Sequence, residues 1–149
     1  MDLVTFLLKA KLRTYATGGE GNERTLSDGT REMSYSEGDF LYRDRYFGFN
    51  PFIGEEVVWE KEKVIWAMNY YGAVTDETVS SGDVYHFLQK AMQRVTAERP
   101  FRGPSEYREG DFIYQDQSEG SVDSFSGEEG IDFQGRQVYS LKYHGGKVG

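Results

Sequence analysis

The chain repeats one sequence pattern twice within its 149 residues. The segment 2–10, DLVTFLLKA, returns as DVYHFLQKA at 83–91. The segment 35–44, YSEGDFLYRD, returns as YREGDFIYQD at 107–116. An internal repeat of this length indicates a duplicated structural unit, because each copy has to form the same elements. The repeat therefore predicts a pseudo-twofold architecture.

The two units are expected to share a single domain, 1–149. A chain of this length buries roughly 70% of its unfolded surface, which is enough for one stable core. We place the first unit at 1–78 and the second at 79–149. The first contains a long polar linker, 17–36, because the offset between the copies falls from 81 at the first matched segments to 72 at the second. This linker is either an insertion tolerated in a surface loop or a lid over a site between the halves.

Each unit is predicted to begin with an amphipathic helix. Apolar residues recur at helical spacing in residues 2–16 and in residues 83–97. Asp2 and Asp83 stand where an N-cap belongs, since a carboxylate there accepts hydrogen bonds from free backbone N–H groups.

Three antiparallel strands are expected to follow each helix. The third strand alternates most clearly, with Trp66, Met68 and Tyr70 on one face in the first unit. We expect this apolar face to lie beneath the helices. The matching residues of the second unit are Tyr139, Leu141 and Tyr143.

Together these elements predict an α+β fold built by tandem duplication of a helix plus a three-stranded antiparallel meander. The expected molecule has about six strands, with two helices on one side and a pseudo-twofold axis between the units. Both a continuous sheet and a half-barrel closed across that axis fit the pattern.

Charge and composition narrow the classes of partner. The chain carries 25 Asp and Glu residues against 17 Lys and Arg, a formal net charge of -8. Such a surface repels phosphate, so we expect no direct nucleic-acid binding. There is no cysteine, which excludes disulfides and thiolate metal sites. The apolar run at 3–12 is short and interrupted by Lys9 and Lys11, so we expect no signal peptide, no membrane partner and a cytoplasmic location.

A ligand site is expected in the cleft between the two repeats, because binding sites favour such seams. The polar faces of the two third strands meet there in the predicted arrangement. An aromatic connection, 46–52, occurs only in the first unit and indicates an apolar pocket, an oligomer contact or a loop folded onto the core. The seven ligand-binding candidates are Asn69, Tyr71, Lys142, His144, Trp59, Tyr46 and Phe49.

Four acidic residues form a second candidate group: Glu55, Glu56, Glu128 and Glu129. Paired carboxylates can share acid and base roles when their pKa values are split. The favoured interpretation is structural, since charges near the start of a strand discourage aggregation at a sheet edge. His86 and His144 are the only histidines, so we expect no metal site. No catalytic residue is assigned and no cofactor is expected.

Several longer segments carry a resemblance to a known family: EGDFLYRD at 37–44, FIGEE at 52–56, WAMNYYG at 66–72, RGP at 102–104 and YHGG at 143–146. With these segments the chain resembles a family of uncharacterised bacterial and archaeal domains. Members of that family occur alone or behind a helix-turn-helix DNA-binding domain of the XRE type. The resemblance implies that the fused members are effector-sensing or oligomerising parts of transcription regulators, and it implies no catalytic residues.

These patterns favour a soluble binding module that senses a small molecule or effector at the cleft between the repeats. The alternative is a protein-interaction or oligomerisation domain, with a protein partner or a homodimer. An enzyme that uses the paired carboxylates is third, so enzymatic activity is uncertain and less expected.

Overall fold

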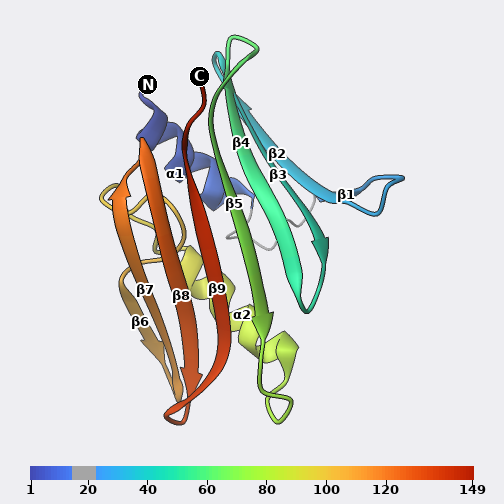
Figure 1. Ribbon diagram of the computed structural model, residues 1–149, viewed down its shortest axis with the longest axis vertical. Helices are drawn as coiled ribbons and strands as arrows, with labels where there is room; N and C mark the ends of the chain where they lie inside the picture. The colour runs from blue at the N-terminus through green and yellow to red at the C-terminus, as the bar shows by residue number, and fades with distance from the viewer. Residues whose placement is uncertain (15–22) are drawn as a thin grey trace.

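The computed structural model describes residues 1–14 and 23–149 (Figure 1). The described chain forms two short helices and nine strands, and most of its ordered backbone is in the strands. The elements in chain order are α1 (Leu3–Arg13), β1 (Arg24–Thr25), β2 (Arg31–Glu37), β3 (Phe40–Gly48), β4 (Phe52–Glu60), β5 (Lys63–Val74), α2 (Ser81–Met92), β6 (Glu106–Glu109), β7 (Phe112–Ser121), β8 (Ser124–Phe133) and β9 (Arg136–Lys147).

All nine strands belong to one continuous antiparallel sheet with the order β1-β2-β3-β4-β5-β9-β8-β7-β6. The two longest strands, β5 and β9, lie side by side at its centre (Figure 1). Their register places Tyr70 opposite Tyr143, and these two residues are equivalent positions of the sequence repeat. The sheet therefore continues across the seam between the repeats and does not close into a half-barrel.

The predicted α+β fold with a duplicated three-stranded meander is wrong, because the molecule is mostly β. The additional strands β2 and β6 precede the predicted meanders and pair with β3 and β7. Most of β2 lies within the predicted polar linker, 17–36, yet the strand buries Met33 to 3% exposure. The signal was the alternation of Met33 and Tyr35 within an otherwise polar segment. Residues 17–22 of that linker lie outside the described residues.

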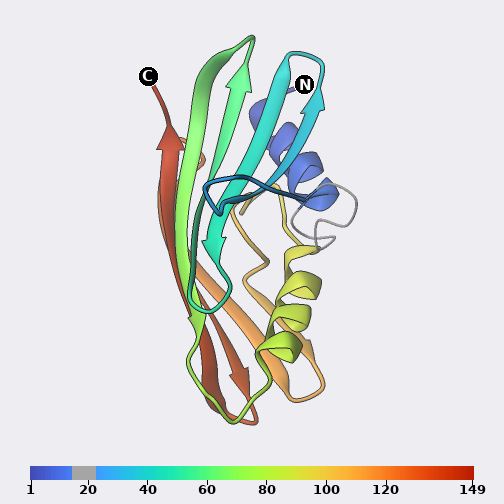
Figure 2. The same ribbon diagram turned by 90° about the vertical axis from the view of Figure 1, so that its right-hand side faces the viewer.

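Both helices cover the same face of the sheet (Figure 2). Asp2 caps α1 as predicted, since its Oδ1 accepts the Thr5 N–H at 2.8 Å. The prediction that Asp83 caps α2 is wrong: Ser80 is the N-cap, and its Oγ accepts the Asp83 N–H at 3.3 Å. The serine precedes the helix by one residue, whereas Asp83 already lies in its first turn. Within the described part of the chain, no helix is long and apolar enough to cross a membrane.

The core between helices and sheet contains the predicted inner faces of the third strands. Trp66, Met68 and Tyr70, with Tyr139, Leu141 and Tyr143, are all at most 2% exposed, so their predicted burial is confirmed.

The helices use matching aromatic contacts in the two halves of the sequence. Phe6 of α1 stacks on Phe40 with ring centroids 4.9 Å apart, and Phe87 of α2 stacks on Phe112 at 5.0 Å. These four residues occupy equivalent positions of the repeat. The matched contacts favour an origin by duplication. The boundary between the two units, at residues 78 and 79, remains a prediction.

Because these contacts are equivalent, we expect removal of either phenylalanine ring to lower the free energy of unfolding by the same amount. We expect Phe6→Ala and Phe87→Ala each to lower the free energy of unfolding by about 3–5 kcal/mol, because each removes a buried ring and leaves a cavity. Urea denaturation measures both values. His86→Ala, an exposed neighbour of Phe87, serves as the control and should leave the midpoint unchanged. A loss confined to one of the two phenylalanine variants would contradict equivalent packing.

Candidate functional site

Four of the predicted binding residues come together on the face of the sheet that points away from the helices. Asn69 and Tyr71 project from β5, and Lys142 and His144 project from the adjacent β9. In the register Asn69 lies opposite His144, and Tyr71 lies opposite Lys142. All four side chains are exposed, because they alternate with the buried residues of the same strands.

These side chains line a groove of about 690 Å³, which we call the outer groove. Arg45 and Phe47 of β3 and Ile53 and Glu55 of β4 extend its surface to one side. The turn before β2 provides a wall through Asp28 and Thr30. Asp28 is fixed in that turn because its Oδ1 accepts the Thr30 N–H at 2.9 Å. The groove thus lies across the seam where we predicted a cleft.

The outer groove combines an apolar row with a charged row. Phe47, Ile53 and Tyr71 are cross-strand neighbours and are 49%, 50% and 55% exposed. Arg45 approaches Glu32 Oε2 at 3.4 Å and Asp28 Oδ2 at 3.9 Å, so its charge is largely compensated. Lys142, in contrast, has no carboxylate within ion-pair distance among the described residues. Glu128 lies opposite Lys142 in the β8–β9 register, and on the other side the ammonium is open to an anion that lies on the apolar row.

The remaining three ligand candidates lie elsewhere. Tyr46 and Phe49 line a separate cavity of about 180 Å³ between the sheet and α2. Trp59 lies outside both cavities, where the guanidinium of Arg43 stands 4.9 Å from its ring centroid. The predicted set therefore divides between the two faces of the sheet, since Tyr46 and Phe49 reach the helix-covered side.

The four acidic candidates also divide between the two faces. Glu55 and Glu128 are exposed on the outer face, and of these Glu55 borders the outer groove. Glu56 and Glu129 point inward and are 2% and 1% exposed. The interpretation of these two as edge charges is wrong, because they lie in the middle of interior strands beneath the helices.

In the first half, Glu56 faces a second buried acid. Asp44 on β3 lies directly opposite Glu56 on β4 in the register, and Asp44 is 0% exposed. Lys11 of α1 donates to Glu56 at 2.6 Å, and the Tyr42 hydroxyl donates to the same Oε1 at 2.5 Å. The Tyr70 hydroxyl donates to Asp44 at 2.5 Å. The carboxyl pair is thus held by one cation and two tyrosines.

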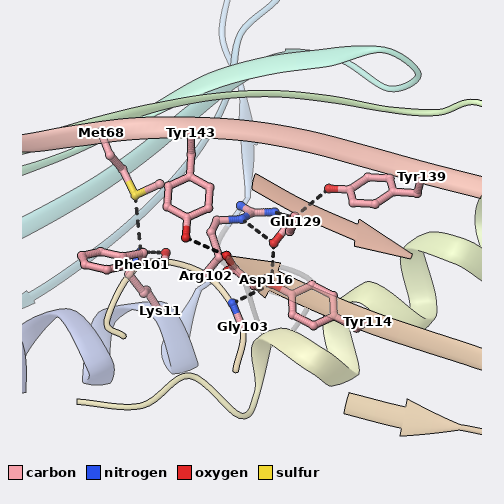
Figure 3. Close-up of polar contacts among 10 residues, drawn as sticks. All are labelled: Lys11, Met68, Phe101, Arg102, Gly103, Tyr114, Asp116, Glu129, Tyr139 and Tyr143. Atoms are coloured by element: carbon pink, nitrogen blue, oxygen red, sulfur yellow. Dashed lines mark hydrogen bonds and ion pairs between the residues drawn. The ribbon is translucent and has the colours of Figure 1, made fainter. Parts of the chain in front are cut away.

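The second half repeats this arrangement with two arginines in place of the lysine, of which Figure 3 draws Arg102. The other, Arg99, has its Nη2 3.1 Å from Asp116 Oδ1. Asp116 on β7 lies opposite Glu129 on β8, and Tyr143 donates to Asp116 at 2.8 Å. The Tyr114 hydroxyl donates to Glu129 at 2.5 Å. Arg102, which is 0% exposed, donates to Glu129 through Nη2 at 2.7 Å. We call the two sets together the buried acid pairs.

Two glycines make room for the tyrosines that serve these pairs. Tyr70 and Tyr143 lie opposite Gly54 and Gly127 in the register. A Cβ atom on either glycine would overlap the neighbouring tyrosine ring and hydroxyl. Each tyrosine ring therefore lies over its glycine, and its hydroxyl reaches the aspartate on the strand beyond. This geometry explains why glycine precedes the paired glutamates in both repeats.

Sequence reasoning missed the three cations that pair with these acids, Lys11, Arg99 and Arg102. Lys11 interrupts the apolar run of α1, and its counterpart in α2 is Met92, so the repeat itself marks position 11 as different. Arg102 lies in the segment between α2 and β6, which contributes the buried residues Phe101 and Gly103 as well. Nothing in its local pattern indicates a buried arginine, because only the long-range contact with Glu129 explains it.

Burial and mutual repulsion raise the pKa of both aspartates. Desolvation is the larger cause for Asp44, followed by the charge of Glu56, and together they raise its pKa from 3.8 to about 7. The same two causes, with Glu129 as the neighbour, raise the pKa of Asp116 to about 7. Each pair therefore retains a proton below neutral pH. The described residues contain no group of three or more His, Cys, Asp or Glu side chains placed to hold a metal ion.

These pKa values predict how stability depends on pH. Between about pH 4 and pH 7 the folded protein keeps protons on Asp44 and Asp116 that the unfolded chain has released. The free energy of unfolding should therefore fall as pH rises through this window, by a few kcal/mol as an order of magnitude, and level off above it. Chemical denaturation at a series of pH values measures the slope.

Variants test whether the two aspartates, and not the other acidic residues, cause this pH dependence. Asp44→Asn and Asp116→Asn should each reduce the slope, because asparagine is neutral throughout and still offers an acceptor oxygen to the tyrosine. Asp39→Asn, at an exposed turn, should keep the wild-type slope. Stability that stays constant or rises between pH 4 and 7 would contradict proton retention by the pairs.

Comparison with known proteins identifies one family. Residues 44–148 match the family described as a domain of unknown function, DUF5680, and this range contains both buried acid pairs and both third strands. No curated protein and no solved structure matches the chain. Since the match covers well over half of the sequence, the chain belongs to the DUF5680 family.

Proposed function

We propose that this protein is a small-molecule binding module and that its ligand lies in the outer groove. The observation that carries the proposal is the meeting of Asn69, Tyr71, Lys142 and His144 across the β5–β9 seam. No intramolecular hydrogen bond or ion pair within the described residues occupies these four side chains. The groove volume of about 690 Å³ lies within the roughly 300–1,000 Å³ of typical ligand sites.

The chemistry of the groove favours a flat aromatic ligand with a carboxylate. Ile53 and Tyr71 offer adjacent apolar surfaces on which a ring can lie. The Lys142 ammonium stands next to Tyr71 in the register and can pair with a carboxylate at the edge of that ring. Asn69 and His144, one row further, can hydrogen-bond to polar substituents.

An effector-sensing role follows as part of the same proposal. The resemblance noted above implies that related domains are fused to XRE-type DNA-binding domains in bacteria and archaea, and a ligand-binding module would serve such regulators as the sensor. The fusion, the source organisms and the cytoplasmic location remain predictions for this chain.

A protein-interaction or homodimerisation surface is the second candidate function. Phe47, Ile53 and Tyr71 are each about half exposed and adjacent, which also suits an apolar partner surface. An enzyme that works through Glu56 or Glu129 is disfavoured, since both side chains are almost completely buried and pair with cations inside the core.

The binding proposal predicts saturable binding of an aromatic carboxylate. Salicylate is a suitable probe, and we expect it to shift the backbone amide resonances of residues 69–71 and 142–144 in ¹H–¹⁵N NMR spectra. Lys142→Met should weaken binding about tenfold, equivalent to about 1.4 kcal/mol, because the ion pair is lost. Tyr71→Ala should weaken it by a similar factor because the stacking surface is removed. Lys63→Met, an exposed lysine outside the groove, is the matched control.

Two results would count against the proposal. Salicylate could leave the groove resonances unchanged at every concentration, or Lys63→Met could weaken binding as much as Lys142→Met. Light scattering on the same samples tests the second candidate, which requires a dimer that Tyr71→Ala dissociates.

A further inference from the structure

A smaller cavity lies on the helix-covered side of the sheet, between α2 and the strands β2 to β5. Its volume is about 180 Å³. Met33, Phe52, Tyr70 and Leu88 form its deeper part and are at most 9% exposed. We propose that this inner cavity binds a small neutral aromatic compound with one hydrogen-bond donor, of the indole or phenol class. The site is separate from the outer groove and does not depend on the function proposed for that groove.

Aromatic side chains surround the inner cavity. Tyr85 of α2 meets Phe49 edge to face with ring centroids 5.0 Å apart, and it meets Phe52 in the same way at 5.8 Å. The Tyr85 hydroxyl donates to the carbonyl oxygen of Phe49 at 2.8 Å, which ties the helix to the loop between β3 and β4. Rings held in this manner present both faces and edges to the cavity. They therefore favour a guest that is itself aromatic, since offset and edge-to-face contacts add to simple burial.

The cavity size restricts the guest to a few ring atoms. An apolar cavity of about 150 Å³ in another protein accommodates benzene. The inner cavity has about 180 Å³ and therefore suits one six-membered ring or a small fused pair.

The polar groups at the cavity favour a neutral donor over an ion. Arg31 and Glu23 form an ion pair at 3.8 Å, and the Tyr46 hydroxyl donates to Glu23 at 3.0 Å, so these charges already compensate one another. Gln89 also borders the cavity, and its half-buried side-chain amide has no hydrogen-bond partner among the described residues. Its carbonyl oxygen can accept the N–H of an indole or the O–H of a phenol. A charged guest would have to compete with the Arg31–Glu23 ion pair for a counterion.

Titration with two probes tests the proposal. Indole and benzene are added separately to the full chain, and ¹H–¹⁵N NMR spectra follow the backbone amides. We expect both probes to give saturable shifts at Phe52, Leu88 and Gln89. Gln89→Leu should weaken indole about tenfold, as expected for the loss of one hydrogen bond, and leave benzene binding unchanged. Gln117→Leu, an exposed glutamine on β7, is the matched control.

A filling variant gives an independent readout. Leu88→Trp places a larger side chain in the cavity and should abolish binding of both probes. If that variant does not fold, the comparison of indole with benzene in Gln89→Leu decides alone. The proposal is overturned if indole causes no saturable shift, if its shifts map to Asn69, Tyr71, Lys142 and His144 instead, or if Gln89→Leu weakens benzene as much as indole.

Discussion

Two pairs of buried carboxyl groups constrain the whole interior of this protein. In each pair, the two carboxyl groups face one another across adjacent strands. Asp44 opposes Glu56 and Asp116 opposes Glu129, and none of the four is more than 3% exposed. Like charges in that position destabilise a sheet unless a proton or a cation compensates them. The surrounding tyrosines, glycines and cations can all be understood as responses to this requirement. Lys11 ties α1 to the sheet, and Arg102 ties the segment after α2 to it.

The two faces of the sheet consequently have different roles. The inner face is occupied by the buried acid pairs and the aromatic contacts of both helices, with the inner cavity beside α2. Neither of the two described helices lies over the outer face, and its central strands present Asn69, Tyr71, Lys142 and His144 to solvent. Exposed recognition residues on the central strands of a continuous sheet suit a preorganised binding site, because the paired backbone of the sheet holds their relative positions.

Sequence reasoning succeeded where a short-range period governs structure. The helical stripe of α1 and the alternation of Trp66, Met68 and Tyr70 follow directly from burial on one side, and the same alternation placed Lys142 and His144 on the other. It failed for β2, a mainly polar strand that pairs with the adjacent β3, because the polar and glycine-rich residues before it favoured a loop. It also failed for Glu56 and Glu129, because an acid in mid-strand is buried only when remote groups such as Lys11 and Arg102 compensate it. Such long-range compensation leaves no local sequence signal.

The protonation state of the two aspartates tests this account most directly. Carbon-13 NMR of the aspartate side-chain carboxyl groups follows each titration in the folded protein. The variants Asp44→Asn and Asp116→Asn assign the two resonances, because each variant removes one of them. The account predicts that two resonances titrate with midpoints near pH 7, as the buried pairs lose their protons. Resonances of Asp44 and Asp116 that are already those of ionised carboxylates at about pH 5 would contradict it, since an unperturbed aspartate is ionised there.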